Sequence, residues 1–276
     1  MSAASTGHVP PRPARLDAGV YLAHLVADSA RFADVLAGCD ATAVVPTCPG
    51  WDASDLLWHL TEVQAFWASV VRNRPAGPGS VVAPERPSSY DDLLALGEHG
   101  SEGLARVLAP VHPAELVWSW SGDHTAAFTY RRQAHEALVH RWDAELTAGV
   151  EHAPVDADLA ADGVAEALEV MFGAPSTGFS PVGGPLEVRL GDVGARLVVR
   201  AGTVAADDGG DEREPRLEVL DDEAAATTPT VATLAGTAAD VDAWLWRRPV
   251  AADAVRLDGD ATTVAAFRAA VARPLG

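Results

Sequence analysis

The spacing of the apolar residues changes near Phe172, and this change constrains the fold more than any other feature of the sequence. Before it, apolar residues recur every three or four positions, which is typical of amphipathic helices. After a Gly-, Pro- and Ser-rich segment at 173–185, apolar and polar residues alternate, which is typical of strands. The sequence therefore predicts an α+β protein of two domains. We expect a helical domain at 14–175 and a small α+β domain at 183–276, preceded by a disordered, proline-rich tail at 1–13.

Helices are expected in both domains, and the pattern of the first domain predicts a bundle of four or five helices. Asp52 and Asp55 have the spacing of a capping pair at the start of the second helix. The expected helices of the first domain lie at about 16–36, 52–70, 88–108, 127–148 and 156–172. The expected elements of the second domain are strands at 186–190, 197–199, 217–219, 231–234 and 255–257 and helices at 237–246 and 262–272.

The charge of the chain restricts its partners. Acidic residues outnumber basic ones by 39 to 20, a formal charge of −19, which argues against nucleic acid because phosphate binding needs clustered cations. No stretch of about 18 apolar residues is present to span a membrane, and the first residues lack the apolar core of a signal peptide. Cys39 and Cys48 are too few for a disulfide framework. We expect a cytoplasmic protein, monomeric or homodimeric, whose partners are small molecules.

The histidines indicate where a metal ion could bind, because all nine lie within the first 152 residues. Glu136 and His140 are one helical turn apart on one face, whereas His135 points about 140° away from His140. Asp143 continues the face of Glu136. His59, on another expected helix, is the best candidate for a third ligand. Two histidines and a glutamate suit Zn²⁺ or a similar divalent ion, and three protein ligands leave a position open for catalysis.

Other interpretations of these residues remain open at this point. His59 can equally be a packed core histidine, with Glu136 and His140 forming a surface ion pair. Cys48 precedes a helix start, where a thiolate is favoured, but it can also be a small buried thiol in a Pro-Gly turn.

Three motifs, in the same order, resemble the mycothiol-dependent maleylpyruvate isomerase family: VPTCPGW, DLLWHL and RQAHEALVHRWD, which begin at residues 45, 55 and 132. The resemblance implies a DinB-like four-helix metal-binding domain followed by a sterol-carrier-like α+β domain. It implies His59, Glu136 and His140 as the metal ligands. Near the end of the chain, LWRR resembles a family motif that reads Leu-Trp-Gly-Arg. Arg247 therefore stands where the family has Gly, and the resemblance implies Arg248 as the arginine presented to the active site.

The resemblance also implies an activity. In that family a metal-bound thiolate of mycothiol adds to the cis double bond of maleylpyruvate, the new single bond rotates, and elimination leaves trans fumarylpyruvate. The substrate is a dianion, so Arg248 is expected to bind a carboxylate at a site between the domains. Two alternatives remain: a mycothiol S-transferase acting on another electrophile, and a non-catalytic protein that binds a metal or small molecule.

Overall fold

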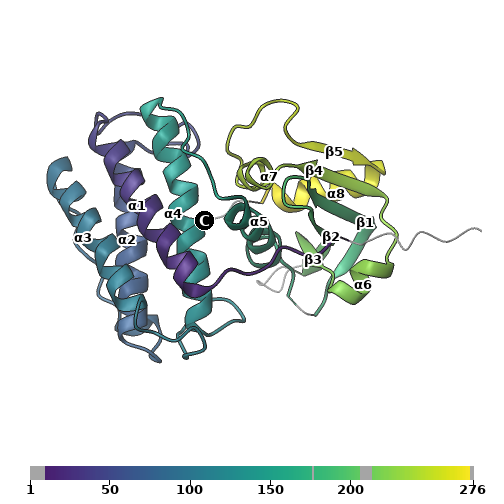
Figure 1. Cartoon of the computed structure of the whole chain (residues 1–276), viewed down its shortest axis with the longest axis horizontal. Coiled ribbons are helices and arrows are strands. Elements are labelled where there is room, and N and C mark those ends of the chain that lie inside the picture. The colour runs from purple at the N-terminus through teal and green to yellow at the C-terminus, as the bar shows by residue number, and fades with distance from the viewer. Residues whose placement is uncertain (1–9, 176, 206–212, 274–276) are drawn as a thin grey trace, which may run out of the picture. The chain divides into compact units, whose positions relative to one another are not determined.

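Figure 1 shows the computed structural model of the chain. The residues that it describes are 10–175, 177–205 and 213–273. The chain divides into two compact units: Leu16–Pro154 is the helical unit, and Val155–Gly276 together with Met1–Arg15 is the mixed unit. The expected α+β class, with helices first and a sheet later, is confirmed. None of the helices in the described residues is long and apolar enough to cross a membrane.

Long helices build the helical unit, and each packs against others along its length. They are α1 (Ala18–Ala37), α2 (Ala53–Arg72), α3 (Tyr90–Leu108) and α4 (Ala126–Ala148), with a short 3₁₀ helix η1 (Pro78–Ser80) between α2 and α3. Helix α1 packs against α4 and α3, and α2 packs against α3 and α4. The two helices that carry the candidate metal ligands are therefore direct neighbours.

Helix α2 begins as the sequence predicts. The Asp52 carboxylate accepts a hydrogen bond from the Asp55 N–H, and the Asp55 carboxylate accepts one from the Asp52 N–H. This reciprocal capping box satisfies two amide donors at the start of the helix. Leu56, Leu60 and Trp67 on its apolar face are buried in the core. The cap and the apolar face together fix where α2 starts and how it is rotated.

Buried charges connect α1 to α4. Nη1 of Arg141 donates a 2.8 Å hydrogen bond to Oδ1 of Asp28. Nε of Arg31 donates to Oε1 of Glu145 at 3.1 Å, and Nδ1 of His152 lies 3.0 Å from the other oxygen of that carboxylate. Burial raises the pKa of Asp28, although the charge of Arg141 opposes this. These contacts hold α4 in one rotational setting against α1.

The mixed unit is built on a five-stranded sheet of order β3-β2-β1-β4-β5, in which β1 and β4 are parallel and the other neighbours antiparallel. The strands are β1 (Ser180–Leu190), β2 (Ala195–Ala205), β3 (Arg213–Val219), β4 (Ala232–Gly236) and β5 (Arg256–Gly259). Leu186, Val188 and Leu190 are buried, as the alternating pattern predicts. Their common face forms part of the core of this unit.

Helices complete the mixed unit. They are α5 (Ala157–Glu166), which continues into a π-helical turn η2 (Ala167–Met171), then α6 (Asp222–Thr227), α7 (Ala238–Leu245) and α8 (Ala261–Val271). Helix α8 packs on β1, β2 and β3, and α5 packs against α7. Helix α6 lies between the expected strands at 217–219 and 231–234, where no helix was expected. Asp221 caps it by accepting a hydrogen bond from the N–H of Ala224.

The boundary between the units lies at 154/155, earlier than the expected limit of the helical domain at 175. The expected helix at 156–172 belongs to the mixed unit because it packs against α7. Gly163 allows this close approach, since a Cβ there would lie 2.5 Å from Oδ2 of Asp242. A larger residue would separate the two helices.

The Gly-, Pro- and Ser-rich segment at 173–185 is also largely structured in its described residues. The N–H of Ala174 donates to the carbonyl of Leu217, and β1 already begins at Ser180. Gly183, with φ of 75°, lies where a Cβ would meet the backbone of α8 at 2.9 Å, so the glycines here serve close packing.

Part of the expected tail at 1–13 has contacts in the mixed unit. Residues 1–9 lie outside the described residues. The N–H of Arg196 donates to the carbonyl of Pro11 at 2.9 Å, and Arg12 forms an ion pair with Glu169. Residues 11 and 12 are therefore held against this unit.

Candidate metal centre

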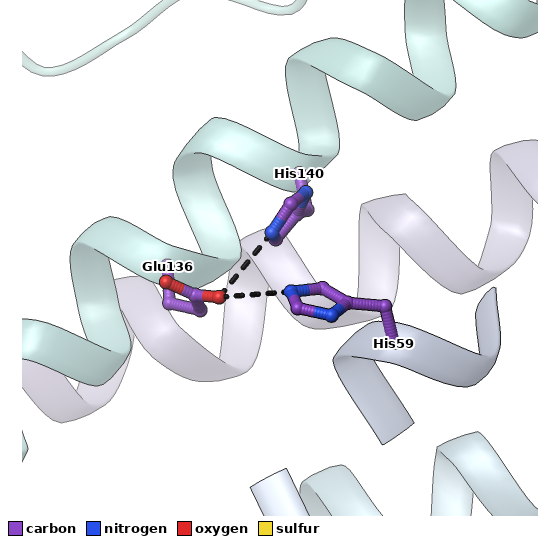
Figure 2. A group of neighbouring side chains, drawn as sticks. All are labelled: His59, Glu136 and His140. Atoms are coloured by element: carbon purple, nitrogen blue, oxygen red, sulfur yellow. Dashed lines mark ion pairs between the residues drawn. The ribbon is translucent and has the colours of Figure 1, made fainter. Parts of the chain in front are cut away.

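The three predicted ligands lie together in the helical unit, and Figure 2 shows them. His59 comes from the second turn of α2, and Glu136 and His140 come from successive turns of α4. Nε2 of His59 lies 3.4 Å from Oε1 of Glu136, and Nε2 of His140 lies 3.2 Å from the same oxygen. The candidate ligand atoms all lie within 4.8 Å of one another. The two helices thus direct three metal-binding groups toward one point.

The spacing of these atoms fits one small divalent ion. Zn²⁺ binds imidazole nitrogen and carboxylate oxygen at about 2.0–2.2 Å, so two ligands of a tetrahedral site lie about 3.4 Å apart. The observed N–O separations of 3.4 and 3.2 Å are close to this value. Two imidazoles and one carboxylate form a donor set typical of a zinc site with an open position.

A buried carboxylate orients His140 through its other ring nitrogen. Oδ2 of Asp143 lies 3.0 Å from Nδ1 of His140, and Asp143 is completely buried. The Thr47 hydroxyl donates a 2.5 Å hydrogen bond to Oδ1 of the same carboxylate. Histidines that bind metals commonly donate their second N–H to a carboxylate, which fixes the tautomer and the ring orientation. Asp143 therefore holds His140 with Nε2 facing Glu136.

Arg132 binds the oxygen of Glu136 that faces away from the histidines. Its Nη2 lies 2.9 Å from Oε2. Burial alone would raise the pKa of Glu136, but hydrogen bonds with His140 and His59 and the charge of Arg132 hold this pKa well below its usual range. Burial lowers the pKa of His140, whereas hydrogen bonds to Asp143 and Glu136 raise it, with a net increase to about 9. Glu136 is thus ionised, and a metal ion must displace a proton from His140.

The loop at 45–51, which carries the first sequence motif, lies beside the cluster. The ring centroid of Trp51 is 4.9 Å from that of His59. Sγ of Cys48 lies 4.0 Å from Oδ2 of Asp143. The loop therefore contacts one candidate ligand directly and reaches α4 through Asp143.

Two of the residues that support the candidate ligands were not predicted from the sequence. Arg132 lies four positions before Glu136, and this i,i+4 spacing was a signal that could have identified the pair. Thr47 is far from Asp143 in sequence, and nothing in the local pattern indicated their hydrogen bond. His135 lies elsewhere, edge-on to the ring of Tyr21, in agreement with its exclusion as a ligand.

The two arginines of the late motif lie beyond the helix that precedes them. Helix α7 ends at Leu245, and the turn after it is a Schellman motif. The N–H of Arg248 donates to the carbonyl of Ala243 at 2.8 Å, and the N–H of Arg247 donates to that of Trp244 at 3.0 Å. Arg247 has φ of 61°, and no other non-glycine residue in the described ranges has a positive φ. The residue that stands in place of Gly thus adopts the conformation that Gly favours.

The side chains of these arginines differ in their surroundings. Arg248 is half-buried, and its Nη1 donates a 2.5 Å hydrogen bond to the carbonyl of Trp246. Arg247 is exposed and donates to the carbonyl of Val271 at 3.4 Å. Both belong to the mixed unit, and the role of Arg248 toward a substrate stays a prediction.

Comparison with known proteins identifies the helical unit. Residues 22–145 match the sequence model of the mycothiol maleylpyruvate isomerase N-terminal domain. The helical unit belongs to this family. The matched range contains all three candidate ligands as well as Thr47 and Asp143, so the family predicted from the motifs is confirmed for the domain that carries the site. No curated protein matches the chain.

Two solved structures resemble the chain over both units. One is a crystal structure of the mycothiol-dependent maleylpyruvate isomerase, with a TM-score of 0.57 and 16% identity. The other is a histidine-to-alanine mutant of the mycothiol-dependent maleylpyruvate isomerase, with a TM-score of 0.59 and 15% identity. Each similarity covers 90% of this chain and 96% of the other. At this identity the likeness shows that the fold is shared.

Proposed function

We propose that the chain is a metal-dependent enzyme that uses mycothiol as a thiol cofactor and isomerises a cis double bond in a substrate like maleylpyruvate. The observation that carries the proposal is the convergence of His59, Glu136 and His140 in a domain of the mycothiol maleylpyruvate isomerase family. A divalent ion, Zn²⁺ by its donor preference, lowers the pKa of a coordinated thiol and favours the nucleophilic thiolate.

The residues of the chain have separate tasks in this proposal. His59, Glu136 and His140 hold the ion. Asp143 keeps the ring of His140 turned toward it, and Arg132 keeps one oxygen of Glu136 directed at the histidines. Holding the three ligands in place before binding reduces the reorganisation that metal binding requires.

The reaction can be followed directly. Zinc-loaded protein is incubated with mycothiol and maleylpyruvate, and the cis and trans isomers are quantified over time. We expect loss of the cis isomer only when protein, zinc and mycothiol are all present, with the thiol recovered unchanged. Accumulation of a thiol conjugate would replace this proposal with a mycothiol S-transferase. Tight zinc binding without either product would indicate a non-catalytic binding protein.

We also propose that Arg248 binds a carboxylate of the substrate. A guanidinium can bind a carboxylate with two parallel hydrogen bonds, and Arg248 is less exposed than its neighbour. Truncating such an arginine costs about 2–5 kcal/mol, so Arg248→Ala should lower kcat/KM roughly thirtyfold or more. Arg247→Ala is the matched control, since its side chain is exposed. Equal activity of the two variants, or a larger loss at Arg247, would show that the wrong arginine has been chosen.

A further inference from the structure

A separate cavity lies in the helical unit between α1, α2 and α3. Its volume is about 470 Å³, within the roughly 300–1,000 Å³ that small-molecule sites occupy. None of the three candidate metal ligands lines it. The proposed isomerase chemistry leaves this cavity without a role.

Small side chains on facing helices keep the cavity open. Helix α1 contributes Ala33, and α3 contributes Ser101 and Ala105. On α3, Gly97 lies so close to α2 that a Cβ there would be 3.0 Å from Oγ1 of Thr61. Helix α3 is therefore packed closely on α2 but leaves space toward α1.

The inside of the cavity is mainly apolar, and its buried polar side chains are Ser29, Thr61 and Gln64, of which Thr61 donates its hydroxyl to the carbonyl of Leu57. Phe32, Leu57 and Leu60 form the apolar part of the lining. Gln64 is 1% exposed and Ser29 is 3% exposed, and Nε2 of the glutamine donates a 2.8 Å hydrogen bond to Oγ of the serine. Within the described residues this is the one hydrogen bond of the glutamine amide. Whichever way the amide is turned, its second polar atom is left to bond a ligand.

The rim of the cavity is acidic. It carries Asp34, Glu98, Glu102 and Arg106. Arg106 pairs with Glu102 at 3.6 Å, which leaves an excess of two carboxylates from Asp34 and Glu98. These negative charges disfavour binding of an anion in the cavity, and the formal charge of −19 on the chain has the same effect.

From this combination we infer that the cavity is a second binding site, specific for an uncharged, mainly apolar molecule that carries one hydrogen-bonding group. The apolar body lies against Phe32, Leu57 and Leu60, and the polar group bonds to the Gln64 amide. The acidic rim excludes carboxylates and sulfonates, so this ligand class differs in charge from the dianionic substrate of the proposed reaction.

A matched pair of fluorescent probes tests the charge selection. N-phenyl-1-naphthylamine is uncharged, apolar and has one N–H group, and 1-anilinonaphthalene-8-sulfonate adds a sulfonate to the same frame. Fluorescence titration should show saturable binding of the uncharged probe at one site per chain and weaker binding of the sulfonate. Reversing the rim charge in the double variant Asp34→Arg and Glu98→Arg should shift the preference toward the sulfonate.

A second pair of variants locates the site. Ala33→Trp places a large side chain in the cavity and should weaken binding of the uncharged probe at least about tenfold, a loss of about 1.4 kcal/mol. Ala27→Trp, on an exposed position of α1 that does not line the cavity, is the control and should bind as the unmodified chain does. Circular dichroism and zinc uptake verify that each variant is folded. Absence of saturable binding, or equal binding by both tryptophan variants, would overturn the inference whatever the outcome for isomerase activity.

Discussion

Replacing Arg247 by Gly should stabilise the mixed unit, because this residue is held in the left-handed conformation at the end of α7. Its φ is 61°, and two backbone hydrogen bonds close the turn around it. A side chain in this conformation costs about 1–2 kcal/mol relative to Gly. Gly also makes the unfolded chain more flexible, and this lowers the gain in stability by about 0.5–1 kcal/mol. The net gain from relieving the backbone is therefore about 1 kcal/mol.

The effect of losing the Arg247 guanidinium on stability must be distinguished from the effect of relieving the backbone strain. Arg247→Ala removes the guanidinium and its hydrogen bonds to the carbonyls of Val271 and Arg273 but keeps the Cβ that causes the strain. We therefore expect Arg247→Gly to be about 1 kcal/mol more stable than Arg247→Ala, or roughly 2–4 °C higher in Tm for a domain of this size. Thermal unfolding followed by calorimetry measures both variants against the unmodified chain. An alanine variant as stable as the glycine variant would refute the strain at this position.

The remaining predictions concern the metal. Elemental analysis of His140→Ala should show less bound zinc. The control is His99→Ala, which replaces an exposed histidine on α3 and should keep full zinc occupancy. Equal zinc occupancy in the two variants would exclude His140 as a ligand. Asp143→Asn should weaken zinc affinity about 10–100-fold while leaving the ligands in place, and an unchanged dissociation constant in a zinc competition titration would refute the orienting role. Removing zinc with a chelator should lower Tm, since saturation at 100 times Kd stabilises the folded state by about 2.7 kcal/mol, and a Tm that zinc does not shift would argue against a specific site.

The local parts of the structure could be predicted from the sequence. The capping box of Asp52 and Asp55 and the shared face of Glu136 and His140 depend on contacts within three or four residues. The third candidate ligand, His59, could be named from the sequence, but its position could not be predicted, because only the packing of α2 against α4 brings it to the other two. Local spacing predicts helices and their faces, and tertiary packing decides which faces meet.

The position of the boundary between the two units could not be predicted for the same reason. Helix α5 has the apolar spacing of the helices before it, and its assignment depends on its fit to α7 at Gly163. The start of β1 was missed because Gly183 and Pro185 indicate a loop by composition, while the strand accommodates them in an irregular stretch between Pro181 and Pro185. A composition shift is therefore a weaker guide to a boundary than the contacts made across it.

The charged run in α4 explains how one helix can define both the candidate metal cluster and the packing of the domain. Glu136 and His140 face α2, and Arg141 and Glu145 on the following turn bind partners that include Asp28 on α1. A slip of α4 by one residue would rotate its side chains by about 100° and break both sets of contacts. Asp28, which stays buried on α1, would then lack its cation Arg141, at a cost of about 3–5 kcal/mol. The ion pairs with α1 therefore disfavour other registers of α4, and this selection sets the geometry of the candidate ligands on another face of the helix.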